Sequence, residues 1–210
     1  AQAPALVLRR EALLLVAGGD ALQPPLHFAG AVVGSTHGSQ SLVVESSGTA
    51  RFDAGVGTGT LALANLATDA AGSTQLGGSL YTTGNQTFAD AVTLTAPTAI
   101  DANDVAFGGG LALGTHDLVL QLGGNFSFGG AASGTGFVSP APRDATQAIY
   151  IGSGGAVPGE ATFDLNPLLS AGITRIGVGR ADGSGTLRVG ALALAADTKL
   201  QTGSGSIVFT

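Results

Sequence analysis

The sequence has no cysteine, methionine or tryptophan, and it has few charged residues. The absence of cysteine excludes a disulfide framework and a thiolate metal site. Charged residues make up only 10 % of the chain, compared with about 25 % in a typical soluble domain. Serine, threonine, asparagine, glutamine and glycine backbone must therefore form much of the surface, which favours an extended fibre over a compact cytosolic protein.

Positive charge is scarce as well. The chain has 8 Lys and Arg residues and a formal net charge of −6. So few basic residues form no basic stripe, which argues against nucleic acid and against anionic membrane surfaces as partners. The most apolar stretch, residues 5–17, is interrupted by charges at residues 9–11 and is too short to span a bilayer. We therefore expect neither nucleic-acid binding nor membrane insertion.

Glycine and apolar residues are abundant. Glycine accounts for 35 of the 210 residues, and hydrophobic residues for 44 %. Glycine and proline together number 43 of 210, below the roughly 25–30 % that is typical of disordered chains. The chain therefore has apolar surface to bury and is expected to fold.

A phenylalanine followed by small residues occurs five times, at successive sequence offsets of 24, 36, 19 and 21. A motif that returns at about 20 residues is typical of a solenoid, in which each coil stacks on the previous one. We predict an all-β fold, a right-handed parallel β-helix (β-solenoid) with about 20 residues per coil. The predicted structural core contains the five motif phenylalanines, Phe28, Phe52, Phe88, Phe107 and Phe128.

A longer repeat accompanies the short one. Residues 41–55 align without gaps on residues 117–131, at a constant offset of 76. A histidine precedes each copy, His37 in the first and His116 in the second. We interpret the two histidines as equivalent structural corners of the repeat.

Composition divides the chain into four parts. Two prolines, Pro140 and Pro142, suggest a loop that leaves the stack, and Asn166, Pro167 and Gly172 suggest a helical turn with an N-cap, a first residue and a terminating glycine. The predicted parts are residues 1–26 as a lead-in or cap, 27–132 as the Phe-motif solenoid, 133–147 as a loop, and 148–210 as a second solenoid half with a helical turn at 166–171.

The two ends are also interpretable. We expect strands at residues 6–8 and 13–16 around a polar corner, and the alternative is a short amphipathic helix that caps the solenoid. The sequence ends within an apolar strand, residues 206–209, without a polar cap. An uncapped solenoid end exposes apolar side chains and edge amides, so we expect another coil or another copy to stack there.

Residues 66–78 and 82–94, with a later block at 148–152 and 173–183, resemble the repeats of bacterial surface exoproteins of the filamentous-haemagglutinin type, which are secreted by the two-partner route. The resemblance covers most of residues 27–210. It implies a right-handed parallel β-helix, export to the bacterial cell surface, and a role in adhesion or as a stalk.

Some parallel β-helices cleave polysaccharides, so carboxylate clusters need weighing. The densest cluster is Asp101 and Asp104, which would serve as general bases or Ca²⁺ ligands, or else as turn residues that bond their own backbone. We favour the turn. A second group, Arg175, Arg180, Asp182 and Arg188, would grip an anionic sugar or form a solvated corner, and we favour the corner.

Other chemical motifs are weaker. His116-Asp117 would begin a hydrolytic triad, but the sequence has no G-x-S-x-G elbow. Three histidines without cysteine give no zinc spacing. The glycine-rich segments 55–59 and 177–179 have no following helix and are interpreted as turns. Asn85 and Asn125 head glycosylation sequons, to which we give little weight.

Two kinds of binding surface also need weighing. An ice-binding face needs threonines that recur at coil spacing. The chain has two threonine pairs, Thr58 with Thr60 and Thr93 with Thr95, but they do not recur at that spacing. A lectin-like module needs aromatic residues outside, and the chain has only two tyrosines, Tyr81 and Tyr150.

We therefore expect a non-catalytic structural segment of an extracellular or cell-surface fibre or adhesin, without a cofactor or metal. Its expected partners are copies of itself or neighbouring repeats of a longer chain, and host or matrix glycans. The alternative is a carbohydrate-binding or polysaccharide-degrading β-helix protein.

Overall fold

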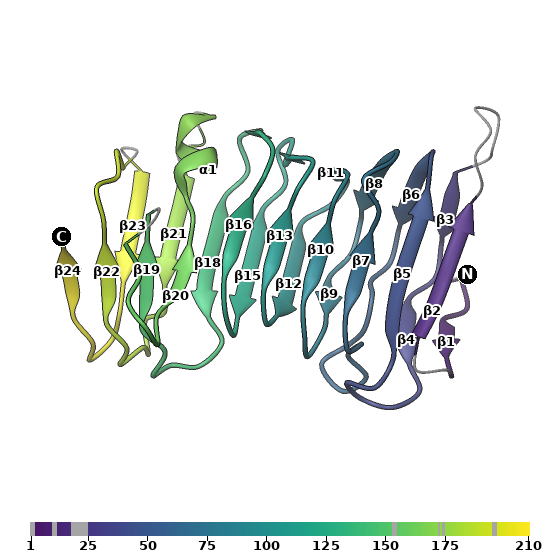
Figure 1. The fold of residues 1–210 in the computed structure, drawn as a ribbon, viewed down its shortest axis with the longest axis horizontal. Coiled ribbons are helices and arrows are strands. Elements are labelled where there is room, and N and C mark those ends of the chain that lie inside the picture. Colours follow the sequence, from purple (N-terminus) through teal and green to yellow (C-terminus); the bar gives the residue numbers. More distant parts are fainter. Residues whose placement is uncertain are drawn as a thin grey trace.

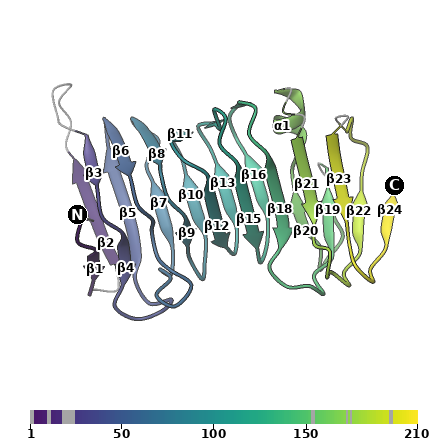
Figure 2. The same cartoon turned by 180° about the vertical axis from the view of Figure 1, so that it is seen from behind.

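The computed structural model describes residues 3–9, 12–17, 25–152, 155–171, 173, 175–194 and 197–210. The strands of successive coils lie side by side along an elongated stack, and the two chain ends lie at opposite ends of it (Figures 1 and 2). Neighbouring strands pair in parallel. The predicted β-solenoid is confirmed.

Three sheets form the sides of the stack, and we name them A, B and C. In spatial order, sheet B contains β2 (Ala12–Ala17), β5 (Ser41–Ser46), β7 (Leu66–Thr68), β10 (Gln86–Phe88), β13 (Val105–Phe107), β16 (Phe126–Phe128), β20 (Ala161–Phe163), β19 (Ile149–Ile151), β22 (Leu187–Val189) and β24 (Ile207–Phe209). Sheet C contains β3 (Leu26–Phe28), β6 (Thr49–Phe52), β8 (Ser73–Leu76), β11 (Ala91–Leu94), β14 (Leu111–Ala112) and β17 (Ala132–Ser133). Sheet A contains β9 (Leu80–Tyr81), β12 (Thr98–Ala102), β15 (Leu118–Leu122), β18 (Val138–Pro142), β21 (Arg175–Gly179) and β23 (Asp197–Gln201).

The strands β1 (Leu6–Leu8) and β4 (Val32–Gly34) pair with each other. They continue the line of sheet A, because Val32 bridges to Val56 and Val56 bridges to Leu80 in β9. The predicted strands at 6–8 and 13–16 are confirmed as β1 and part of β2. Arg10 and Glu11 of the predicted corner, and Pro24, lie outside the described residues.

The register gives the coil length. In sheet A, Leu80 pairs with Ile100 and Ile100 with Leu120, so one coil corresponds to a sequence offset of 20. The first coils are longer, because Phe28 pairs with Phe52 at an offset of 24. Ten strands in sheet B, spaced by ~4.8 Å, give a sheet about 43 Å from edge to edge.

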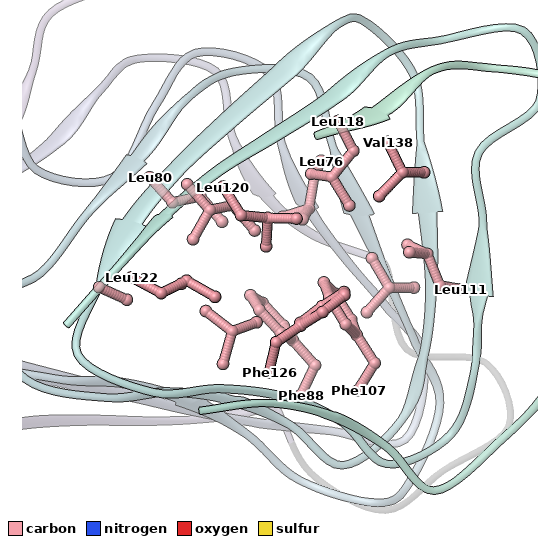
Figure 3. Packing of buried hydrophobic residues seen from close by; sticks show 14 of the residues in the cluster. Leu76, Leu80, Phe88, Phe107, Leu111, Leu118, Leu120, Leu122, Phe126 and Val138 are labelled. Atoms are coloured by element: carbon pink, nitrogen blue, oxygen red, sulfur yellow. The ribbon is translucent and has the colours of Figure 1, made fainter. Parts of the chain in front are cut away.

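Alternation of side chains builds the core. In β15, Leu118, Leu120 and Leu122 are buried, while the residues between them are exposed. Figure 3 shows these leucines facing the rings of Phe88 and Phe107 in the interior, together with further core residues. Burial of such side chains contributes about 1.5–3 kcal/mol each, and because every coil adds its own set, the core is continuous along the stack.

The five motif phenylalanines do not form one column. Phe28 and Phe52 stack in sheet C, with ring centroids 4.6 Å apart. The other three pair in register in sheet B, in the order Phe88, Phe107 and Phe128. The offset of 36 between Phe52 and Phe88, which fits neither one coil nor two, marks the change from sheet C to sheet B.

Burial also differs within the set. Four of the five are buried, but Phe128 is only partly buried and packs against the core from its margin. Phe126, two positions earlier, is fully buried instead. The small residues after Phe107 and Phe128 allow neighbouring coils to approach closely: a Cβ at Gly109 or Gly130 would collide with the backbone of the preceding coil.

The long repeat at an offset of 76 does not mark equivalent positions. Residues 41–46 form β5 in sheet B, whereas the aligned residues 117–122 contain β15 of sheet A. Short alternating apolar strands suit any side of a solenoid, so similarity between two strands does not fix the side. The equivalence that we inferred for His37 and His116 is therefore wrong.

The predicted loop at 133–147 is wrong for residues 138–142, which form β18 between β15 and β21. The amide of Arg143 donates to the Leu122 carbonyl in β15 at 2.6 Å. Because successive residues of a parallel strand bond to alternate neighbours, Pro140 and Pro142 direct their nitrogens towards β21. Between β18 and β21 the paired residues are Val138 and Ile176. The missing N–H groups of the two prolines therefore remove few hydrogen bonds from the sheet.

Beyond β18 the strand order changes. Strand β20 lies between β16 and β19, so β19 leaves a place in the sheet that a later part of the chain fills. The helix α1 (Asn166–Ser170) follows (Figure 1), and it contacts β17, at the edge of sheet C. The predicted helical turn is confirmed, but Leu165 is the N-cap, and Asn166 is the first helical residue. Gly172 lies outside the described residues.

Candidate functional site

A column of polar side chains runs along one corner of the stack, directly before the strands of sheet B. The side-chain Oδ1 of each member accepts the backbone amide of the next coil: Asn65 from Asn85 at 2.9 Å, Asn85 from Asp104 at 3.2 Å, Asp104 from Asn125 at 2.6 Å, and Asn125 from Thr162 at 2.8 Å. We call these four residues the Asn/Asp column. Asp104 thus lies in a turn and has a structural role, as predicted, but its carboxylate bonds the next coil and not its own backbone, so that part of the prediction is wrong.

The Asn/Asp column was missed at the sequence level, although it has a signal. Its members recur at sequence offsets of 20, 19 and 21, each one position before a strand of sheet B. Both sequon asparagines, Asn85 and Asn125, belong to it, and their carbonyl oxygens are occupied by hydrogen bonds. The two asparagines therefore have a structural role between coils.

A hollow of about 250 Å³ lies where sheet A turns towards sheet B. It is lined by His37, Tyr81, Thr83, Asp101 and Arg143, with small residues between them. A second hollow of about 120 Å³ shares Tyr81 and Asp101 and extends over the outer face of sheet A. We call the two hollows together the sheet A groove.

Arg143 braces the groove across three coils. Its Nε donates to Asp101 Oδ1 at 2.7 Å, and one terminal nitrogen donates to the Thr82 carbonyl at 3.1 Å. The side chain passes Gly123, where a Cβ would lie 3.7 Å from Nη1 of Arg143. Arg180 donates in turn to the Arg143 carbonyl at 2.6 Å, so the position of Arg143 is held from both sides.

A buried amide lies behind the groove. Gln86 is 0 % exposed, and its Nε2 donates to Thr82 Oγ1 at 3.2 Å and to the Asp101 carbonyl at 3.4 Å. Its Oε1 has no hydrogen-bond partner among the described residues. The register neighbours of Gln86 in sheet B are Leu66 and Val105, so an apolar residue is expected at this position.

The structure thus brings together some residues that the sequence singled out and separates others. His37, Tyr81 and Asp101 line one groove, although they are far apart in the sequence.

Asp117 Oδ1 accepts the amide of Phe137 at 2.8 Å, so the pair His116-Asp117 belongs to a turn. Tyr150 is buried under the side chain of Arg188, whose Cζ lies 4.7 Å from the ring centroid, and it offers no lectin surface.

The four residues that would grip an anionic sugar do not converge. Arg188 in sheet B pairs with Glu160, and Arg180 pairs with Asp182 at 2.8 Å in the turn after β21. Arg175 lies over the ring of Phe137, 5.8 Å from its centroid. Hydrogen bonding by Arg188 holds the pKa of Glu160 below its ordinary value. These pairs are structural, but the predicted single solvated corner is wrong, because Arg175 lies in sheet A and Arg188 in sheet B, where it pairs with a largely buried Glu160.

One buried carboxyl group was missed by the sequence analysis. Asp90 is 4 % exposed, at the corner between β10 and β11. It accepts hydrogen bonds from Thr68 Oγ1 at 2.8 Å and from Thr74 Oγ1 at 2.7 Å. Burial raises the pKa of Asp90 above its ordinary value, against the lowering effect of the two hydroxyls.

Two smaller predictions also have outcomes. Gly55–Gly59 lie in a loop, but Gly177–Gly179 end strand β21, so the predicted turn there is wrong. A Cβ at Gly177 would lie 2.7 Å from the ring of Phe137, which explains the glycine. Within the described ranges, no three His, Asp or Glu side chains cluster to hold a metal ion.

Comparison with protein-family models, with curated proteins and with solved structures finds no match to this chain. In the part of the chain that the structure describes, no helix is long and apolar enough to cross a membrane.

Proposed function

We propose that this chain is a non-catalytic structural segment of a secreted or cell-surface fibre or adhesin, which stacks end to end as a stalk or filament. The observation that supports this most is the Asn/Asp column. In this column, Asn and Asp side chains accept hydrogen bonds from the next coil, from Asn65 as far as Thr162, and so have a structural role. Such bonds favour a stiff, continuous rod.

Both ends of the stack expose apolar side chains. At one end, β24 continues the register of β22, and Phe209 is 69 % exposed next to Val189 in that register. At the other end, a hollow of about 420 Å³ is lined by Leu6, Leu15, Leu26 and Phe28. A further coil on either end, from the same polypeptide or from another copy, would cover apolar surface and pair edge strands.

Electron microscopy of the purified chain over rising concentration tests end-to-end stacking. We expect rods of constant width whose length grows in steps of about 48 Å, because each copy adds ten strands of sheet B at ~4.8 Å each. Phe209→Asp should keep the rods at one step, because the charge would lie at the stacked end. Lateral clusters, or growth that Phe209→Asp leaves unchanged, would contradict stacking between copies.

A second candidate function is carbohydrate binding, with or without cleavage of a polysaccharide. The sheet A groove favours it, because it combines an aromatic side chain with converging polar groups on one side of the stack.

A further inference from the structure

The sheet A groove runs along the axis of the stack. Tyr81, Asp101 and Gln121 are consecutive register partners in β9, β12 and β15, so their backbones lie ~4.8 Å apart from coil to coil. That rise is comparable to the length of one pyranose ring. A chain of sugar rings laid along the axis would therefore meet an equivalent position of the protein at each ring.

The side chains of the groove suit a polyhydroxylated ligand. Tyr81 and Val119 supply apolar surface, and Val119 is 41 % exposed on the outer face of sheet A. Polar groups adjoin this surface: Asp101 and Gln121 follow Tyr81 in the same register, and Thr83 lines the first hollow. Pyranose rings have apolar C–H faces and hydroxyl rims, and sites of this kind pair an aromatic platform with a few placed polar groups.

The charges favour a neutral ligand. Asp101 and Arg143, the two oppositely charged side chains among those that line the groove, neutralise each other. The guanidinium is directed to Asp101 Oδ1 and the Thr82 carbonyl, which leaves Asp101 Oδ2 to accept from a hydroxyl. His37 Nδ1 accepts the amide of Ala62 at 3.3 Å, so the ring is a donor at Nε2.

Gln86 is explained by the same groove. A buried amide whose oxygen has no partner among the described residues is less favourable than an apolar side chain, and Leu66 and Val105 show that an apolar side chain fits the neighbouring positions. What the amide provides is two hydrogen bonds, to Thr82 and to the backbone of Asp101, which both line the groove. Departures from local rules of this kind are expected behind functional sites.

We propose that the sheet A groove binds a neutral oligosaccharide along the axis of the stack, with Tyr81 as the platform, Asp101 as a hydroxyl partner held in place by Arg143, and Gln86 as a positioning residue behind them. This inference deepens the carbohydrate-binding candidate and is independent of end-to-end stacking.

Calorimetric titration with cellohexaose, xylohexaose, mannohexaose and maltohexaose tests the proposal, with a hexamer of galacturonic acid as the acidic comparison. We expect at least one neutral hexamer to bind with a Kd between roughly 10 μM and 1 mM, and its monosaccharide to bind more weakly, because the groove spans several coils. Tyr81→Ala should weaken binding about tenfold or more, while Tyr81→Phe keeps the ring and should stay within about threefold of the parent.

Thr93→Ala, on the outer face of sheet C, is the matched control and should leave the affinity unchanged. Gln86→Leu separates positioning from stability: we expect equal or higher thermal stability together with weaker binding. The opposite pattern, with lower stability and unchanged affinity, would overturn the role of Gln86. The groove proposal is overturned if none of the four neutral hexamers binds, if the acidic hexamer binds more tightly, or if a folded Tyr81→Ala variant binds like the parent.

Discussion

The ring of Phe107 stacks on the ring of Phe128 one coil later, with centroids 5.6 Å apart, yet only Phe107 is fully buried. Truncation of these two register partners to alanine should therefore lower the free energy of unfolding by different amounts. Phe107→Ala should lower the free energy of unfolding by ~3–5 kcal/mol, because it leaves a cavity in the core. Phe128→Ala should cost clearly less, and Phe126→Ala should resemble Phe107→Ala. Urea unfolding of the three variants measures the difference, and equal losses at positions 126 and 128 would contradict the assigned burial.

The Asn/Asp column makes a prediction about Asp104. Asparagine offers the same Oδ1 acceptor, so Asp104→Asn should change stability by less than about 0.5 kcal/mol, whereas Asp104→Ala removes the partner of the Asn125 amide and should cost about 0.5–1.5 kcal/mol. The control is Thr87→Ala on an exposed position of β10, which should be nearly neutral. A large loss in Asp104→Asn would show that the charge, and not the hydrogen bond, matters.

The buried Asp90 makes stability depend on pH. Its pKa is raised in the folded state by burial, so the folded chain holds this proton more tightly than the unfolded chain does. The contribution of Asp90 to stability is therefore fullest below its ordinary pKa of 3.8, and it is lost as the pH rises through the raised folded value.

Asp90→Asn removes this titration. Compared with the parent, the variant should gain stability as the pH rises from the ordinary pKa of Asp90, 3.8, through the raised folded value, and the gain should then level off. Urea midpoints of both proteins at several pH values measure the gain. Parallel pH profiles would mean that Asp90 is not titrating inside the stack.

Much of the fold could be predicted from the sequence, because each coil of a solenoid repeats the same pattern of buried positions and strand pairing. The offsets of 24, 19 and 21 between phenylalanines equal true register distances. The side of the stack to which each Phe belongs could not be predicted, since an apolar residue fits the inside of sheet B and of sheet C equally well. The offset of 36 reflects the change from sheet C to sheet B, but this change can be recognised only once the pairing of the strands is known.

The candidate site was harder to predict. Tyr81, Asp101 and His37 each stand out in the sequence, but nothing there places them together, because the groove is built from loops and strands of different coils. The contribution of Arg143 depends on its reach back to Asp101, two coils earlier, across a glycine. Pro140 and Pro142 indicated a loop because the direction of their missing N–H groups depends on the neighbouring strand.

An ion pair connects the inserted strand β20 to the neighbouring coils. Arg188 in β22 binds Glu160 through Nε at 2.9 Å and through a terminal nitrogen at 2.5 Å, and the same nitrogen donates to the Gly155 carbonyl. The Glu160 side chain is 8 % exposed. The pair thus ties the segment before β20 to a strand on the far side of β19.

Glu160→Gln should loosen that segment without unfolding the rod, because the core of the other coils does not depend on it. We expect faster amide hydrogen exchange in residues 155–163 and unchanged exchange in β12 and β15. Acid should have the same effect on the parent: the lowered pKa of Glu160 means that its contribution is present above the ordinary value of 4.5 and is lost as the pH falls through the folded value. If exchange in residues 155–163 were as slow in Glu160→Gln as in the parent, the hydrogen bonds between β20 and its neighbours would be sufficient to hold the insertion.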